Sequence, residues 1–301
     1  MKAIRILFST ALLGLTFMAY SQDYAFRVMA SMGSNQVKSG GEWKALKTGS
    51  SLKANDELKL SDKAYVGLIH SGGKSIELRE AGVYKVSELE QKVPNGKGAA
   101  AKYADYLANQ MGPEAKKNRL SATGAVHRGQ LGGADINVYM PNSVQVFKNY
   151  AIVRWDPVEA GKVTYKVVVM NMFEDVLISE ETNNTFFELD LNNKMIESYP
   201  NVLLVVTTAD DDNIKSETIA IKKLPSNYKT QVSSGLNDLM SGVGEETALN
   251  KYILAGFYEE NNLLVDALTS YEEAIKLAPE VETYKEAYEE FLLRNGLKSG
   301  K

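Results

Sequence analysis

Few residues of this 301-residue chain could carry out chemistry, and their spacing fits no common catalytic motif. The chain has no Cys, which excludes a thiol nucleophile, a disulfide and a thiolate metal site. Its two histidines are His70, expected at a strand end, and His127, expected in a linker. No G-x-S-x-G sequence supplies a nucleophile for either of them. The sequence therefore predicts no catalytic residue and favours a binding or scaffolding protein over an enzyme.

Three polar segments could hold ions but lack the spacing that such sites need. The run Asp210-Asp211-Asp212-Asn213 offers oxygen atoms to Ca²⁺, yet the alternating ligand pattern fails at Ile214, and Ile221 stands where a bidentate Glu would be. Ser39-Gly40-Gly41 and Ser71-Gly72-Gly73 lack the Gly-Lys-Ser/Thr ending of a phosphate loop. We interpret all three as turns, with calcium binding at the acidic run as the alternative, and predict no metal and no cofactor.

Residues 1–21 have the pattern of a secretory signal peptide. Lys2 and Arg5 precede the apolar stretch Ile6–Ala19, and the small residue Ser21 comes before the expected cleavage site. We therefore predict an exported protein, periplasmic, envelope-associated or secreted, with an uncleaved anchor as the alternative. The chain has 34 Lys and Arg against 38 Asp and Glu, which argues against a nucleic-acid partner. No later apolar run is long enough for a membrane span, so we do not expect an integral membrane protein after cleavage.

The elements that follow fall into three regions of different composition. Residues 23–90 contain seven short candidate strands separated by Gly, Ser, Asn and Asp, which is typical of a small all-β barrel or sandwich. Residues 91–135 are rich in Gly and Ala, and Ala99–Met111 within them is a candidate helix ended by Gly112-Pro113. We interpret the remainder of residues 91–135 as a solvated linker.

One motif in residues 23–90 resembles the FecR-like extracytoplasmic β-domain. The pattern G-x-W-x-x-L-x-x-G-x-x-L-x-x-x-D is present, and an alternating apolar strand, a glycine pair and a second short strand follow it. The resemblance implies only the fold. Because Trp43 lies among alternating apolar residues, we predict that it anchors the core of this module. The residues of the motif are Gly41, Trp43, Leu46, Gly49, Leu52 and Asp56, followed by Ala64–Leu68, Gly72-Gly73 and Ile76–Leu78.

Residues 136–225 return to alternating apolar strands. The order Trp155, Pro157, Tyr165, Val167 and Val169 resembles the fibronectin type III and related Ig-like β-sandwiches. The resemblance implies that Trp155 and Tyr165 anchor the core, and a different sandwich with the same two aromatics is the alternative. Because a separate tryptophan is expected in each β-module, we predict that the two modules unfold independently.

Residues 226–296 are predicted to be helical, and residues 248–281 resemble one tetratricopeptide (TPR) repeat. Small residues let the paired helices approach, aromatics wedge between them, and a proline ends the second helix. Lys251 and Ala255 depart from the usual Trp and Gly of the pattern. A single repeat needs support from a neighbouring element. The structural positions of the repeat are Leu254, Tyr258, Ala267, Tyr271, Ala274 and Pro279.

Acidic residues dominate these helices, which suggests a docking face for a basic partner. We predict that acidic and apolar side chains of the first helix and the second form this face, and the alternative is a merely solvated acidic surface. A reversal of charge at Glu259 and Glu260 is expected to leave the fold intact. The candidate partner-binding residues are Ile253, Phe257, Glu259, Glu260 and Leu264.

Together these patterns predict a multidomain β-plus-α protein with a FecR-like β-domain, an Ig-like sandwich and a C-terminal TPR-like helical hairpin. The function that they favour is a non-catalytic envelope scaffold or adaptor that recruits a protein partner. The alternative is an exported carbohydrate- or surface-binding protein that uses its β-modules. An enzyme would need a hidden polar pocket around Asp210 or His70.

Overall fold

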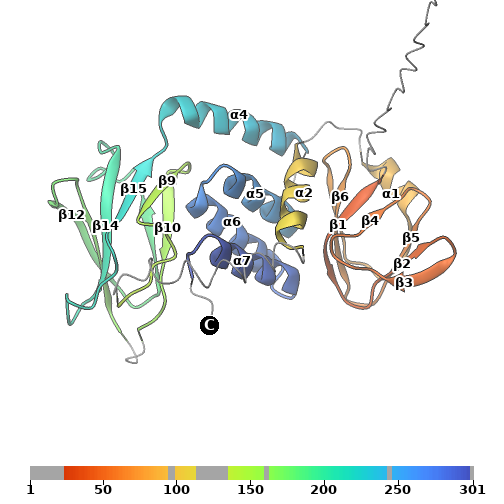
Figure 1. Cartoon of the computed structure of the whole chain (residues 1–301), viewed down its shortest axis with the longest axis horizontal. Coiled ribbons are helices and arrows are strands. Elements are labelled where there is room, and N and C mark those ends of the chain that lie inside the picture. The colour runs from red at the N-terminus through yellow and green to blue at the C-terminus, as the bar shows by residue number, and fades with distance from the viewer. Residues whose placement is uncertain (1–23, 94–98, 113–134, 159–162, 243–245, 299–301) are drawn as a thin grey trace, which may run out of the picture.

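A computed structural model describes residues 24–93, 99–112, 135–158, 163–242 and 246–298. The signal peptide predicted for residues 1–21 and the linker residue His127 lie outside the described residues. The chain is a mixed β and α protein in which helices lie between two groups of strands (Figure 1). Among the described helices, none is both long and apolar enough to cross a membrane.

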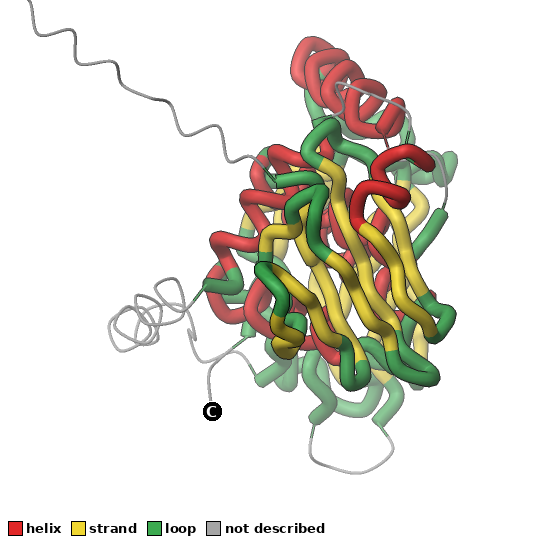
Figure 2. The backbone as a smooth tube through the Cα atoms, turned by 90° about the vertical axis from the view of Figure 1, so that its right-hand side faces the viewer, coloured by secondary structure: helices red, strands yellow, loops and turns green. Residues whose placement is uncertain are grey.

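The N-terminal strands form two four-stranded antiparallel sheets, with orders β4-β1-β6-β7 and β3-β2-β5-β8. These strands face the viewer in Figure 2. In the described residues they remain two sheets and do not close into one barrel. Gly73 turns the chain between β6 and β7 with a φ of 83°, which glycine adopts without steric cost. The strands are β1 (Phe26–Met32), β2 (Gln36–Ser39), β3 (Glu42–Ala45), β4 (Ser51–Leu52), β5 (Glu57–Leu60), β6 (Tyr65–His70), β7 (Ser75–Leu78) and β8 (Gly82–Lys85).

The predicted core position of Trp43 is wrong. Trp43 lies on β3, an edge strand whose four residues are all exposed, and 37% of its surface remains accessible. The ammonium group of Lys38, on the neighbouring strand β2, lies over the Trp43 ring, where a core tryptophan would have apolar side chains. The core between the two sheets is filled by other residues, among them Phe26, Val28, Leu52, Leu58, Val66 and Leu68.

The central strands form a five-stranded sheet, β12-β11-β14-β15-β9, and a two-stranded sheet, β10-β13. Both predicted core aromatics are buried as expected, and the rings of Trp155 and Tyr165 meet edge to face at 5.3 Å. β9 pairs with β15 in parallel, and the other pairs are antiparallel. The strands are β9 (Ser143–Val146), β10 (Tyr150–Arg154), β11 (Tyr165–Met170), β12 (Val176–Thr182), β13 (Phe186–Asp190), β14 (Asn201–Thr208) and β15 (Ile219–Lys223).

Local sequence explains where the C-terminal helices begin and turn. The Thr247 side chain accepts a hydrogen bond from the Asn250 N–H, which caps the start of α5. Asn262 adopts a left-handed φ of 56° in the short link to α6, a conformation that Asn tolerates. The helices are α1 (Val86–Lys92), α2 (Ala100–Gln110), α4 (Ser226–Gly242), α5 (Ala248–Glu260), α6 (Leu264–Leu277) and α7 (Glu282–Arg294).

The helices share apolar cores with both groups of strands. Met29 and Tyr65 of the N-terminal sheet belong to the same buried cluster as α2 and α4–α7. On the other side, Val265 of α6 belongs to the core of the central sheets. Residues 91–135 therefore contain an element, α2, that packs into the helical core. The helical layer is the part of the fold that connects the two groups of strands.

Candidate functional site

The five residues predicted to bind a partner do not form one surface. Ile253, Phe257 and Glu259 are buried, Leu264 is half-buried, and Glu260 is exposed. The docking face predicted from the sequence is therefore wrong for the three buried residues. Phe257 packs against α2 and α4, whereas Glu259 lies against α6 and the end of α7.

Helices α2 and α4 cover the side of α5 that carries Phe257. The rings of Tyr103 and Phe257 meet edge to face at 5.2 Å. Gly256 lets α2 approach so closely that an added Cβ would lie 2.8 Å from the Cγ of Leu107. An added Cβ at Gly235 of α4 would lie 3.3 Å from the ring of Phe257. The side of the hairpin that could receive a partner is thus filled by the chain's own helices.

Glu259 is the centre of a buried polar cluster. Its carboxylate accepts two hydrogen bonds from the Arg294 guanidinium, at 2.5 and 2.6 Å, and one from the Tyr271 hydroxyl at 3.0 Å. The side-chain amide of Asn295 donates a further bond of 3.0 Å. The cluster joins α5, α6 and the end of α7, and its ion pair raises the pKa of Arg294 despite burial. The expectation that charge reversal at Glu259 leaves the fold intact is therefore wrong, because a buried charge would lose its partner.

The residues assigned to the repeat pattern have the burial expected of an inter-helix interface, with two exceptions. Tyr258, Ala267, Tyr271 and Ala274 are buried. Leu254 is half-buried, and the exposed Pro279 lies two residues beyond the end of α6. Tyr271 contacts Phe291 of α7, with ring centroids 5.0 Å apart. These positions stabilise the hairpin and α7 together.

Polar contacts fix the N-terminal sheet against the helices. The Glu77 carboxylate accepts a 2.8 Å hydrogen bond from the Leu249 N–H at the start of α5, where negative charge is favourable. The hydroxyls of Tyr65 and Tyr284 lie 2.6 Å apart in a buried contact. Arg79 pairs with both Glu77 and Glu280. Sheet, α5 and α7 therefore hold each other in one orientation.

A second set of polar contacts fixes the sandwich against α6. The buried Asp266 carboxylate accepts hydrogen bonds from the backbone N–H groups of Phe147 and Lys148, at 2.9 and 3.1 Å. Burial raises the pKa of Asp266. Arg154 of β10 forms an ion pair with Glu272 of α6, and burial raises the pKa of that carboxyl. Nothing in the sequence around these residues pointed to this role, because their partners lie more than 100 residues away.

The residues that could have done chemistry have structural roles. The Nδ1 atom of His70 accepts a hydrogen bond from the Gly72 N–H at 2.9 Å, and its ring meets Phe26 edge to face. Asp211 accepts from the Asn213 N–H, and Asp212 pairs with Lys166, as in a turn with a surface ion pair. Within the described part of the chain, no group of three or more His, Cys, Asp or Glu could hold a metal ion.

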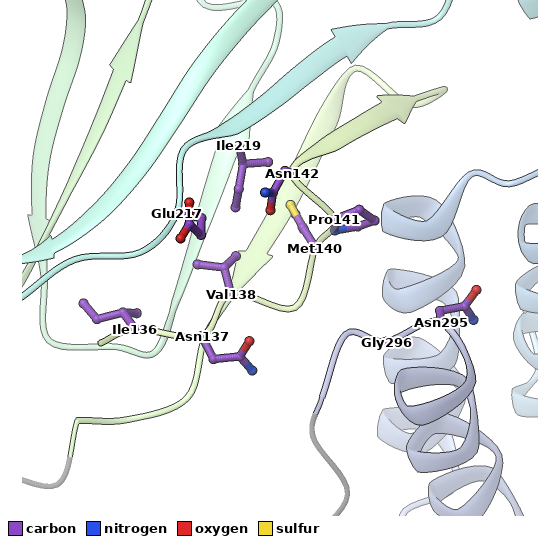
Figure 3. Close-up of a pocket in the computed structure, with 10 residues that line it drawn as sticks. All are labelled: Ile136, Asn137, Val138, Met140, Pro141, Asn142, Glu217, Ile219, Asn295 and Gly296. Carbon is purple, nitrogen blue, oxygen red and sulfur yellow. The ribbon is translucent and has the colours of Figure 1, made fainter. Parts of the chain in front are cut away.

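A small cavity lies between the sandwich and the end of α7 (Figure 3). Its volume of about 70 Å³ is enough for a few water molecules and too small for an organic ligand. Apolar side chains such as Val138, Met140 and Ile219 contribute much of its lining. Asn295, at the helical side, points away from the cavity and donates to Glu259 instead. We assign no chemistry to this cavity.

No family model and no curated protein sequence matches this chain. Part of the helical surface remains accessible on α7. On α7 this surface is acidic, because Glu282, Glu286 and Glu289 follow one another at helical spacing and are exposed. Glu282 pairs with Lys285, and Glu289 pairs with Lys298. Glu260, the exposed member of the predicted face, pairs with Lys102.

Proposed function

We propose that this protein is an exported, non-catalytic scaffold or adaptor of the cell envelope that recruits a protein partner. In this proposal the helical layer has the TPR-like fold, residues 24–90 have the FecR-like fold, and residues 136–225 have the Ig-like fold. The paired short sheets, the buried Trp155 and Tyr165, and the small and aromatic residues between α5 and α6 support these assignments.

One observation carries the proposal: the helical layer shares a core with one β-module and a buried carboxylate contact with the other. Such a layer holds two modules in a fixed orientation, which is what a scaffold requires. The side of α5 facing α2 and α4 is occupied, so the partner surface that we propose is the exposed acidic stripe of α7, Glu282, Glu286 and Glu289. We expect a partner with a basic surface, since complementary charge accelerates and orients association.

The test places a photo-crosslinking amino acid at Glu286 of the mature chain, in the envelope of the producing cell. The matched control places the same amino acid at Glu181 on strand β12, an exposed acidic position distant from the helices in the sheet order. The proposal predicts a discrete crosslinked protein from Glu286 and none of that size from Glu181. Replacing Glu282 and Glu289 by Lys should weaken this crosslink at low salt. An absent crosslink, or an identical one from both positions, would contradict the proposal.

The alternative is a carbohydrate- or surface-binding protein, and the exposed aromatics of the β-modules favour it. Phe173 in the turn between β11 and β12 is 88% exposed, and Trp43 and Phe186 are also exposed. These aromatics belong to separate strands and turns of two modules, so they do not form one continuous row. Retention of the protein by an insoluble cell-wall polysaccharide, and loss of retention in Phe173→Ser, would favour this alternative.

A further inference from the structure

A cavity of about 540 Å³ lies where the sandwich meets the start of α4, and its charge differs from that of the whole chain. Three lysines from three separate segments line it, whereas the chain as a whole has a net charge of −4. Among the described residues of the lining, Glu197 is the one carboxylate. Buried apolar residues and neutral polar residues complete it. The lysines are Lys148, Lys223 and Lys229, and the buried apolar residues are Val146, Leu191 and Leu224.

Among the described residues, the hydrogen-bond partners of two of these ammonium groups are neutral, although the charge of Lys148 also acts on the buried Asp266 carboxyl. Lys148 Nζ lies 3.4 Å from the Tyr150 hydroxyl, and Lys229 Nζ lies 3.3 Å from the Asn149 side-chain oxygen. Both distances are long for charged hydrogen bonds. An ammonium group without a carboxylate in hydrogen-bond contact gains more from a bound anion than one in a close ion pair.

The third lysine shapes the cavity. Lys223 donates to the backbone carbonyls of Ile196 and Glu197, at 3.1 and 2.7 Å, and so holds the loop that lines one side. Burial lowers the pKa of Lys223, and the charge of Glu197 opposes this shift only in part.

The helix end beside the cavity favours negative charge. Helix α4 begins at Ser226 beside the lining residue Leu224, and its first turn contains no acidic residue. The N-terminal end of a helix carries partial positive charge. Asp266 of α6 holds the turn that carries Lys148, because its carboxylate accepts hydrogen bonds from the N–H groups of Phe147 and Lys148. The cavity is thus held in shape by β15, α4 and α6.

We propose that this cavity binds a phosphate ester. In the complex, Lys148 and Lys229 contact the phosphoryl oxygens, and the polar body of the ligand lies against Asn149, Asn192 and Ser198. A lysine ammonium acts as a point charge with three donors, which suits a phosphate, whereas planar recognition of a carboxylate is the usual role of Arg. The volume lies within the 300–1,000 Å³ range that is typical of small-molecule sites. The same chemistry is offered by a soluble sugar or glycerol phosphate and by a phospholipid headgroup.

Calorimetry with glycerol 3-phosphate, and with glycerol as the uncharged probe, tests the proposal on the mature chain. We expect saturable binding of glycerol 3-phosphate and none of glycerol. In Lys148→Gln/Lys229→Gln the affinity should fall by about a hundredfold, since each of the two lost charged contacts costs roughly tenfold. The matched control is Lys222→Gln/Lys276→Gln, which removes the same charge outside the lining and should bind like the parent. Circular dichroism checks that both variants are folded.

Sedimentation with vesicles of phosphatidylglycerol, compared with vesicles of phosphatidylcholine, distinguishes the two ligand sources. Binding of glycerol 3-phosphate without sedimentation identifies a soluble phosphate ester. Sedimentation that depends on Lys148 and Lys229 and exceeds that with phosphatidylcholine identifies a headgroup. Either result supports the site. The proposal is overturned if neither probe binds, or if both double variants lose binding equally, because that would show only general attraction of anions to lysine.

Discussion

Replacement of Glu259 by Ala tests whether α7 docks through the buried polar cluster. The change removes the acceptor of two Arg294 hydrogen bonds and of the bonds from Tyr271 and Asn295. Only 4% of the Glu259 side chain and 15% of the Arg294 side chain are exposed, so water cannot replace these bonds fully. Loss of one partner from such a buried pair costs about 3–5 kcal/mol of unfolding free energy. For a urea m-value of about 3 kcal/mol/M, the unfolding midpoint should fall by roughly 1–1.7 M.

The neighbouring residue offers a matched control. Glu260 has the same side chain on the same helix, but it pairs with Lys102 at the surface. Glu260→Ala should change the unfolding free energy by at most about 1 kcal/mol. In the double variant Glu259→Leu/Arg294→Met, apolar contacts replace the ion pair, and much of the lost stability should return. Urea unfolding followed by circular dichroism at 222 nm measures all three variants. Equal midpoints for Glu259→Ala and Glu260→Ala would refute the reasoning.

Three further predictions follow from the core and from the contacts between elements. Trp155→Ala should lower the unfolding free energy by about 3–5 kcal/mol, whereas Trp43→Ala should change it by at most about 1 kcal/mol, because only Trp155 is buried. Thermal melts of both variants measure the difference. Gly256→Ala should destabilise by about 1–3 kcal/mol because its Cβ meets Leu107, and Leu107→Ala in the same chain should remove this extra cost in a double-mutant cycle. Folding raises the pKa of Asp266. The protonated carboxyl therefore stabilises the folded state fully below the unfolded pKa, and this stabilisation is lost as pH rises through the folded pKa. Urea midpoints of the parent relative to Asp266→Asn should therefore fall as pH rises above the ordinary pKa of an Asp, and a constant difference would contradict this.

Local patterns could predict elements and core positions where neighbours in sequence decide the outcome. The alternation around Trp155 and Tyr165 places both in the core, and the run Ala99–Met111 contains helix α2 at Ala100–Gln110. The prediction that Trp43 lies in the core is wrong because a turn-rich motif shows that a strand exists, but not that the strand lies at the edge of its sheet.

The candidate site was less predictable, because segments far apart in the sequence decide which side of a helix is covered. The sequence of α5 alone predicts that Ile253 and Phe257 form an apolar docking face. Helix α2, about 150 residues earlier in the chain, covers the side of α5 that carries Phe257. Glu259 was predicted to be a surface charge because its partner Arg294 lies 35 residues later in the chain, beyond the repeat unit. Hydrophobic periodicity shows that a face must be covered, and it does not show by what.

The central claim is that the helical layer and the N-terminal sheet form one cooperative unit, because Met29 and Tyr65 belong to the buried cluster of the helices. Native-state hydrogen exchange at increasing urea tests this claim directly, because it gives an opening free energy for each segment. Peptides from β6, which is buried throughout, should open together with peptides from α5 and α6, with equal free energies and equal urea dependence. If α5 and α6 lose protection at urea concentrations where β6 stays protected, the shared core does not couple them, and the account is wrong.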